Sequence, residues 1–200
     1  VVTNNVAEYR ALIAGLEAAE RALGMSSQQI VDEVRESGLR GRGGAAFPAG
    51  IKWQTVLDAP GEQKYVVCNA DEGDSGTFAD RMLMEGDPMS LVEGMIIASL
   101  AVGATRGYIY LREEYPQARR ILQQAIAAVR DAGYLGESIC GAAHRFELEL
   151  RIGAGAYICG EETSLLESLE GKRGVVRAKP PLPAIAGLFG QPTVVNNVIT

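Results

Sequence analysis

The sequence predicts an α/β fold in which a parallel sheet is flanked by helices. Three short runs have the composition of buried strands, at residues 64–68, 108–111 and 146–152. Helical patterns of ten or more residues separate them, at 89–102 and 115–132. Strands that alternate with helices of this length form βαβ units, whose strands run parallel. The 200 residues fit one domain with at most a short appendage.

Two helices are predicted before the first strand. Residues 6–23 are rich in Ala and Leu, carry apolar side chains at helical spacing, and end at Gly24. Ser26 or Ser27 caps a second helix, whose apolar face begins at Ile30 and which stops at Gly38. The glycine-rich stretch GLRGRGGAAF, residues 38–47, follows directly and predicts a loop.

The rest of the chain alternates between strands, loops and helices. KYVVC (64–68) predicts a buried strand, and the polar residues 69–77 form the loop after it. A buried helix follows at 89–102, then the strand YIYL (108–111) and an amphipathic helix at 115–132. FELELRI (146–152) alternates as a strand does; a glycine loop (153–160), a helix (161–169) and an extended arm from residue 179 complete the pattern. The Met and Leu residues between 82 and 95 are expected in the core.

Two of the three predicted strands end in conspicuous loops. NADEGDSGTF follows the first strand and GAGAYICGEET follows the third. In open parallel sheets, ligands bind beyond the carboxyl ends of the strands. We therefore expect a binding site built from these loops on a Rossmann-like sheet.

Composition excludes several classes of protein. The net charge is −6, which argues against nucleic-acid or anionic-membrane binding. The cysteines Cys68, Cys140 and Cys159 form no CxxC pair, which predicts a reducing, cytoplasmic location. His144 is the single histidine, so a histidine-based metal site is not expected. No apolar run is long enough to cross a bilayer, so we expect no direct membrane insertion.

The glycine loop has two interpretations. Gly41, Gly43 and Ala46 match G-x-G-x-x-A, but no strand precedes them, so this is not a dinucleotide fingerprint. Glycines still allow backbone N–H groups to approach an anion, and either loop arginine or Lys52 could add charge-assisted bonds. The alternative is a flexible connector.

The two strand-end loops also leave alternatives open. Asn69, Asp71, Glu72 and Asp74 could bind a divalent metal, a ribose or a polar ring edge, or could form an Asx-rich turn. The glutamates that start the helix at 161 suit the positive end of its dipole. Because acids there disfavour phosphate, a polar, hydrogen-bonding ligand is the better match.

Four segments together resemble one family. They are ESGLRGRGGAAFPAGIKW, YVVCNADEGDSGTFADRMLMEGDP, GAGAYICGEETSLLESLEGKRGVVRAKPP and GLFGQPTVVNNV, in that order. In order and spacing they resemble the flavin-binding, NADH-oxidising subunit of respiratory complex I. The diaphorase subunit of NAD-linked hydrogenases and the beta subunit of NAD-dependent formate dehydrogenases are related, and RAKPPLPAIAGLFGQP is most similar to these two. The resemblance covers residues 25–200.

The resemblance implies FMN as cofactor and NADH as substrate, with hydride passing from nicotinamide C4 to flavin N5 and no catalytic protein nucleophile. Carried over residue by residue, the FMN-binding positions are Gly41, Arg42, Gly43, Lys52, Asn69, Asp71, Glu72, Tyr157, Gly160, Glu161, Glu162, Val195, Asn196, Asn197 and Thr200. The positions near NADH are Phe47, Asp74 and Glu162, and no metal site is implied.

This sequence departs from the family pattern at several positions. Ala46 stands where glycine is common, and Asp74 is shorter than the usual glutamate. Thr55 and Leu182 replace aromatics that some members carry, and Ile199 replaces an acid. These changes favour FMN binding over efficient NADH turnover.

The family continues into a ubiquitin-like domain and a helical bundle that holds a four-iron cluster. The cluster's CxxCxxC ligands are absent from this sequence. The resemblance also implies partners, namely a thioredoxin-like iron–sulfur subunit and a larger redox complex, which can be peripheral to a membrane on its cytoplasmic side. We expect residues 25–200 to be an FMN- and NADH-binding domain truncated before those parts.

Residues 1–24 are interpreted as a leader helix, foreign or fused. TNNVAEYRALIAGLEAA (3–19) resembles a ribonuclease H segment in which Glu8 would be a metal ligand, but that enzyme's other acids are not recognisable. The sequence thus predicts an FMN-binding NADH dehydrogenase domain. The alternatives are a non-catalytic fragment or interaction module without flavin, and a ribonuclease H-like nuclease.

Overall fold

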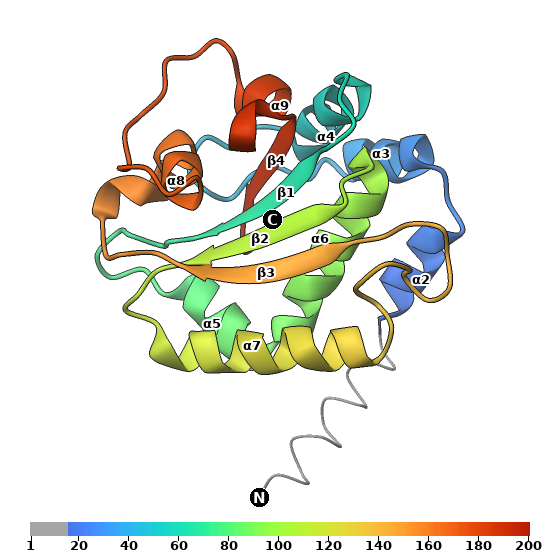
Figure 1. Ribbon diagram of the computed structural model, residues 1–200, viewed down its shortest axis with the longest axis horizontal. Coiled ribbons are helices and arrows are strands. Elements are labelled where there is room, and N and C mark those ends of the chain that lie inside the picture. The colour runs from blue at the N-terminus through green and yellow to red at the C-terminus, as the bar shows by residue number, and fades with distance from the viewer. Residues whose placement is uncertain (1–15) are drawn as a thin grey trace, which may run out of the picture.

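The fold is a four-stranded, fully parallel sheet, described here from a computed structural model covering residues 16–200 (Figure 1). The strands are β1 (Tyr65–Ala70), β2 (Arg106–Leu111), β3 (Glu147–Ile152) and β4 (Thr193–Asn197), in the spatial order β3-β2-β1-β4. In this register Val67 of the central strand lies between Tyr108 and Val195. The predicted Rossmann-like α/β class is confirmed.

Three helices cover one face of the sheet (Figure 1). They are α5 (Ala79–Gly86), α6 (Pro88–Val102) and α7 (Pro116–Asp131). α6 is apolar around most of its circumference because it is enclosed by the sheet on one side and other helices on the other. Val66, Ile109 and Leu148 point from successive strands into this main core.

The opposite face of the sheet carries a smaller core. It is covered by the short helix η1 (Tyr157–Gly160), by α8 (Glu162–Leu169) and by η2 (Leu188–Gly190). Tyr65, Val67, Tyr108, Tyr110 and Val195 pack there against Leu165, Leu166 and Leu188. The sheet is therefore buried on both faces, as a parallel sheet requires.

The N-terminal helices pack beside the sheet. They are α2 (Glu17–Leu23), α3 (Ser27–Glu36) and α4 (Ala49–Asp58), and α9 (Pro183–Ala186) lies next to α4 and β4. Ser26 caps α3 in a capping box with Gln29, which explains why α3 begins there. The carboxylate of Glu93 in α6 accepts hydrogen bonds from the first amides of α2, at Ala18 and Ala19. Residues 6–15 of the predicted leader helix, with Glu8, lie outside the described residues.

The sequence patterns did not predict α4, α5, β4 or the short helices η1, α9 and η2, and α9 lies in the stretch predicted as an extended arm. α4 was missed because it follows directly on a glycine-rich loop. α5 was missed because the residues before it, NADEGDSGTF, have the composition of a loop. β4 has only five residues and ends in two asparagines, so it gives a weak strand pattern. The prediction that all Met and Leu residues from 82 to 95 are core was wrong at Met82, which is 67% exposed because it lies on the outer face of α5.

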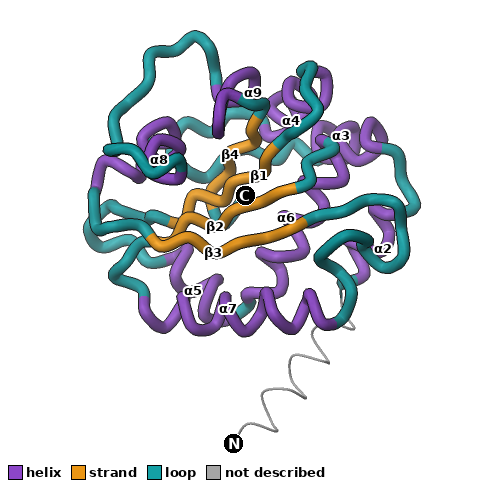
Figure 2. The backbone as a smooth tube through the Cα atoms, in the orientation of Figure 1, coloured by secondary structure: helices purple, strands orange, loops and turns teal. Residues whose placement is uncertain are grey.

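The loops that follow β1, β2 and β3 gather at the left-hand end of the sheet in Figure 2. These are the carboxyl ends of the strands, where the predicted site was expected. Within residues 16–200, no helix combines the length and the apolar character needed to span a membrane. The same residues contain no group of three or more His, Cys, Asp or Glu side chains suited to holding a metal ion.

Candidate functional site

The glycine loop is a closed turn pinned to the end of β4. The amide of Gly41 donates to the carbonyl of Phe47 at 2.9 Å, which brings the two ends of the loop together. The amide of Arg42 donates to Asn197 Oδ1 (3.2 Å) and to Thr200 Oγ1 (3.1 Å). Residues more than 150 positions apart in sequence are therefore joined in one wall.

Two backbone positions in this loop explain its shape. Gly44 has φ of +109°, a value that residues with a side chain rarely adopt. Ala46 has φ of +51°, in the left-handed region that favours glycine. A side chain built at Gly43 meets nothing closer than Asn197 Cβ at 4.0 Å. The space in front of Gly43 is thus open, and any larger side chain would project into it.

Lys52 enters the site from the first turn of α4. Its Nζ lies 2.6 Å from the carbonyl oxygen of Val195 and donates a hydrogen bond to it. Burial lowers the pKa of Lys52; the nearby charge of Glu162 opposes this shift and that of Lys179 adds to it. The lysine is a partly buried cation placed at the centre of a polar cluster.

The loop after β1 is tied to the loop after β3. Asn69 donates from Nδ2 to the carbonyl of Gly160 (2.8 Å), and its Oδ1 accepts from the amide of Asp71 (3.2 Å). Asp71 is only 6% exposed. Burial raises the pKa of Asp71 to about 6. The negative charge of Glu114 adds to this shift, and the positive charge of Arg112 opposes it.

The carboxylate of Glu72 turns toward α5. Its Oε1 accepts from the amide of Asp80 (2.9 Å) and its Oε2 from the amide of Arg81 (3.1 Å). Tyr115 Oη also donates to Oε2, at 2.9 Å. The side chain of Glu72 is therefore occupied as the cap of α5, although the residue lines the cavity described below.

Glu161 and Glu162 begin α8, as the dipole interpretation predicted. Glu161 caps the helix through Oε2, which accepts from the amides of Thr163 (2.8 Å) and Ser164 (2.9 Å). Lys179 bridges both glutamates, at 3.0 Å from Glu161 and 2.7 Å from Glu162. Burial acts to raise the pKa of Glu161, but these hydrogen bonds and Lys179 outweigh it, so the pKa is lowered.

Tyr157 and Asp74 meet across the mouth of the site. Tyr157 is 70% exposed, and its hydroxyl donates to Asp74 Oδ1 at 2.8 Å. A Cβ added at Gly73 would lie only 3.0 Å from the Tyr157 ring, so any larger residue there would displace the ring. The pair joins the loop after β1 to η1.

Two adjoining cavities occupy the space between these loops. The first, which we call the acidic cavity, has a volume of about 620 Å³, and its lining includes Arg42, Glu72, Asp74 and Tyr157. The second, the lysine cavity, has about 520 Å³ and is lined by Phe47, Lys52, Glu162 and Val195 among others. The residues that line both are Gly43, Asn69, Gly160, Glu161 and Asn197. Both volumes lie in the range of small-molecule and cofactor sites.

The sequence-predicted residues converge on these cavities. Those that line one or both are Gly41, Arg42, Gly43, Phe47, Lys52, Asn69, Glu72, Asp74, Tyr157, Gly160, Glu161, Glu162, Val195, Asn196 and Asn197. Asp71 lines neither, but its Oδ2 lies 3.2 Å from the position of a side chain built at Gly160. Thr200 lines neither, and reaches the site through its bond to the Arg42 amide.

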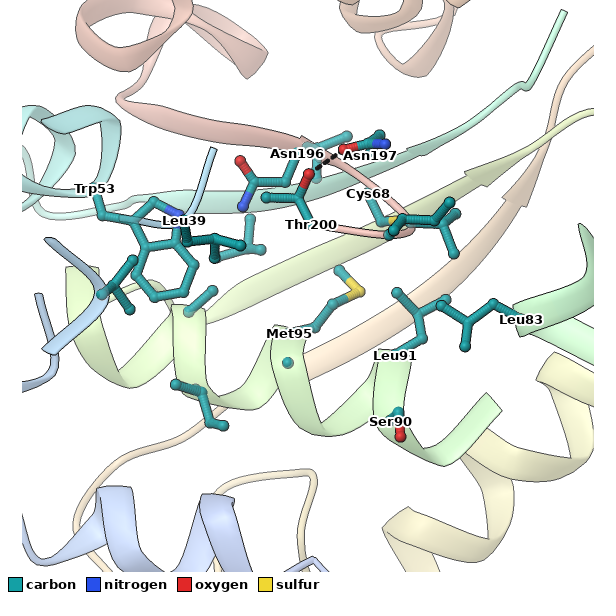
Figure 3. A pocket seen from close by; sticks show the side chains of 18 residues that line it. Leu39, Trp53, Cys68, Leu83, Ser90, Leu91, Met95, Asn196, Asn197 and Thr200 are labelled. Atoms are coloured by element: carbon teal, nitrogen blue, oxygen red, sulfur yellow. Dashed lines mark hydrogen bonds between the residues drawn. The ribbon is translucent and has the colours of Figure 1, made fainter. Parts of the chain in front are cut away.

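A third, apolar cavity of about 340 Å³ lies on the other side of β4, between the sheet and α6 (Figure 3). Trp53, Met95 and Leu91 line it, and Asn196, Asn197 and Thr200 form its edge nearest the site. Thr200 donates to Asn197 Oδ1, as the dashed line in Figure 3 marks. The C-terminal asparagines therefore separate an apolar cavity from a polar one.

Sequence reasoning missed Lys179, Arg112 and Tyr115 as residues that shape the site. Lys179 lay in a stretch interpreted only as an extended arm, and its two acidic partners are 17 and 18 positions away. Arg112 and Tyr115 follow β2 in a stretch that has no glycine and whose acids, Glu113 and Glu114, have the pattern of a solvated helix face. The one available signal was their position at the carboxyl end of a parallel strand.

Comparison with known proteins shows the family. The family described as "Nuo51 FMN-binding domain" matches residues 34–200. An NADH-quinone oxidoreductase subunit of Rhizobium meliloti (strain 1021) is 54% identical over 187 residues, which is 93% of this chain and 44% of the relative. The NADP-reducing hydrogenase subunit HndC of Solidesulfovibrio fructosivorans is 53% identical over 196 residues, 98% of this chain and 40% of the relative. The chain thus spans less than half the length of these curated relatives.

A solved structure agrees with the sequence comparison. The crystal structure of an NAD+-reducing [NiFe]-hydrogenase in the H2-reduced state matches with a TM-score of 0.80 and 45% identity. The match covers 90% of this chain and 30% of that one. This chain and the solved structure therefore agree in both fold and sequence. The family match to residues 34–200 covers more than half of the chain. The chain belongs to the Nuo51 FMN-binding domain family.

Proposed function

We propose that the two joined cavities bind FMN and admit NADH, so that the chain is the flavin-binding part of an NADH:acceptor oxidoreductase. One observation carries the proposal: Gly43, Asn69, Gly160, Glu161 and Asn197, from four separate segments, line both cavities at once. A ligand that fills both would contact every segment that resembles the family.

The donor set suits a phosphorylated flavin. The glycine loop offers backbone N–H groups, and Lys52 offers a partly buried ammonium group for a phosphate or the ribityl oxygens. Asn69 and Asp71 lie where they could bond the polar edge of a flavin ring. We assign Glu72 the role of holding this loop in position and not a direct bond to the flavin, because its carboxylate already accepts hydrogen bonds from α5.

The lysine cavity suits the adenine end of NADH. Phe47 and Leu182 line it with about half of each side chain exposed, and Thr55 lies beside them. An aromatic and an aliphatic surface can sandwich a purine ring. Glu162 and Asp74 are the acids available to ribose or carboxamide groups, and Asp74 must share its oxygens with the Tyr157 hydroxyl.

Bound FMN would supply the acceptor for hydride from the nicotinamide ring. The chain's own residues would bind, orient and enclose the two partners, and no side chain needs to act as a nucleophile. We further propose that electrons leave toward an iron–sulfur cluster outside this chain. The chain would then be part of a complex with a thioredoxin-like iron–sulfur subunit, on the cytoplasmic side of a membrane. The support for this is the family to which the chain belongs.

Equilibrium titration with FMN and with riboflavin tests the binding proposal. Flavin fluorescence should be quenched at one site per chain, and FMN should bind at least tenfold tighter than riboflavin because only FMN carries the phosphate. Equal affinity for both would contradict the role of Lys52 and the glycine loop. Absence of binding by both would favour the alternative of a fragment that keeps the fold without the flavin.

A further inference from the structure

The loop that follows β1 adopts an unfavourable backbone conformation at one residue. Glu72 has φ of +32°, outside the region that residues with a side chain normally occupy. Non-glycine residues persist in such conformations only when the surrounding structure holds them. The loop contributes Asp71, Gly73 and Asp74 to the site, so whatever holds Glu72 also sets the position of these residues.

The holding contacts come from the segment after β2. Arg112 Nη1 donates to the carbonyl oxygen of Glu72 at 2.5 Å, and Tyr115 Oη donates to its carboxylate at 2.9 Å. The guanidinium group of Arg112 lies over the Tyr115 ring, 5.0 Å from its centroid. Arg112 is itself held by Glu114, at 3.1 Å. The two side chains therefore hold Glu72 by hydrogen bonds to both its backbone carbonyl and its carboxylate.

The third set of contacts ties this assembly to a helix. The carboxylate of Glu72 accepts from the amides of Asp80 and Arg81, in the first turn of α5, and α5 lies beside α7 on one face of the sheet (Figure 1). Tyr115 is the residue that precedes α7. The loop is consequently fixed to two helices and to the end of β2 through one residue, Glu72.

We propose that Arg112 and Tyr115 are positioning residues for the flavin site, acting through Glu72. This inference rests on the proposed function. Neither residue lines any of the three cavities described above, so neither would touch the flavin or NADH. Their effect on a ligand passes through the backbone at Asp71, Gly73 and Asp74.

The test substitution is Tyr115→Phe, which removes one hydroxyl group and leaves the ring over which Arg112 lies. Tyr134→Phe is a matched control, because Tyr134 is also buried and also donates its hydroxyl to a glutamate, Glu20, but on α2 and outside the cavities described here. In flavin-free protein, amide hydrogen exchange at Asp80 and Arg81 should be faster in Tyr115→Phe and unchanged in Tyr134→Phe.

With FMN present, Tyr115→Phe should raise the FMN dissociation constant severalfold, and by about tenfold at most, because the lost hydrogen bond holds the loop and does not reach the ligand, so that only the cost of ordering the loop enters the free energy of binding. The visible circular dichroism of the bound flavin should change as well, which a loss of global stability alone would not cause. Tyr134→Phe should match the parent in both. If Tyr115→Phe proves unstable, Arg112→Lys tests the same assembly by changing the donor to the backbone carbonyl of Glu72.

The outcomes separate this inference from the proposed function. Unchanged FMN affinity and dichroism in Tyr115→Phe, with a parent that binds FMN, would overturn the positioning role. A parent that binds no FMN would overturn the proposed function. In that case, faster amide exchange at Asp80 and Arg81 in Tyr115→Phe would still support the claim that Tyr115 holds Glu72 in place. Unchanged exchange would overturn that claim.

Discussion

Lys52 Nζ donates a 2.6 Å hydrogen bond to the carbonyl oxygen of Val195, which joins α4 to β4 at the base of the lysine cavity. Within residues 16–200 the ammonium group has no other hydrogen bond, although Glu162 and Lys179 are close enough to affect its pKa. A partly buried cation with unused donors stabilises a fold poorly but suits an anionic ligand.

Lys52→Met should therefore separate binding from stability. FMN affinity should fall at least tenfold, because a charged donor is lost. The free energy of unfolding of the flavin-free protein should change by less than about 1 kcal/mol, since relief from burying the charge offsets the lost bond to Val195. Flavin titration and urea unfolding check the two values. A variant that loses stability but keeps FMN affinity would assign Lys52 a structural role.

Gly43→Val should block the cavities without harming the fold. The Cβ of a valine at Gly43 would meet only Asn197 Cβ, at 4.0 Å, and the side chain would occupy the volume shared by both cavities. FMN affinity should fall more than tenfold while the melting temperature stays near that of the parent. Gly86→Val, at another glycine with nothing within 4 Å of its added side chain, is the control and should bind FMN normally.

Asp71 should make a contribution to stability that decreases as pH rises from about 4 to about 6. Burial raises the pKa of Asp71 to about 6, so the folded state favours the protonated acid. That contribution is fully present below the ordinary pKa of about 3.8 and is lost as pH passes the raised value. Asp80 shifts in the same direction, to about 6, through burial and the charge of Glu72.

Asp71→Asn should flatten this dependence by an amount on the order of 2 kcal/mol. Urea unfolding of flavin-free protein at several pH values measures the slope. The lowered pKa of Glu161 acts with the opposite sign, because its contribution is present above the ordinary pKa of 4.5 and is lost as pH falls through the lowered value. Parent and variant share this contribution, so it cancels in their comparison. An Asp71→Asn variant with the parent's slope would mean that Asp71 is ionised without penalty in the fold.

Arg177 should hold the arm that carries Lys179. Its guanidinium group pairs with Glu167 at 2.5 Å and Glu170 at 2.7 Å, and it donates to the carbonyl of Gly187 at 2.7 Å. The Glu170 side chain is only 6% exposed, and without Arg177 it keeps only the mostly exposed Lys172 (2.7 Å) as a cationic partner, so its charge is less well compensated. Arg177→Ala should lower the free energy of unfolding by about 3 kcal/mol.

The control for Arg177 is Arg21→Ala. The Arg21–Glu33 pair is mostly exposed, at 69% and 51%, and its loss should cost less than about 0.5 kcal/mol. Urea unfolding of both variants gives the comparison. Equal effects would show that the Arg177 network contributes no more than a surface pair.

The carboxyl-end site could be predicted from the sequence, since a buried strand followed by NADEGDSGTF places its acids at that edge of a parallel sheet. The convergence of Asn69 with Gly160 was a prediction from family resemblance, and their 2.8 Å bond spans 91 positions in the chain. Periodicity alone carries no information about contacts at that separation.

The roles of individual acids could not be predicted. Glu72 and Asp71 are neighbours in sequence with similar chemistry, yet one caps α5 while the other is buried beside Gly160. The difference coincides with the left-handed backbone at Glu72, where Arg112 and Tyr115, from the segment after β2, donate hydrogen bonds to the residue. β4 was missed for a related reason: a five-residue strand is specified by its pairing with β1 more than by its own residues.

The most direct test of the central claim is the visible absorbance of the protein after reconstitution with FMN and desalting, before and after anaerobic addition of NADH. We predict that the flavin spectrum is retained through desalting and bleaches on addition of NADH. A retained spectrum that does not bleach would support the flavin site but contradict NADH oxidation, and would direct attention to Asp74 and Leu182. Loss of all flavin on desalting would contradict the claim that these joined cavities form a flavin site.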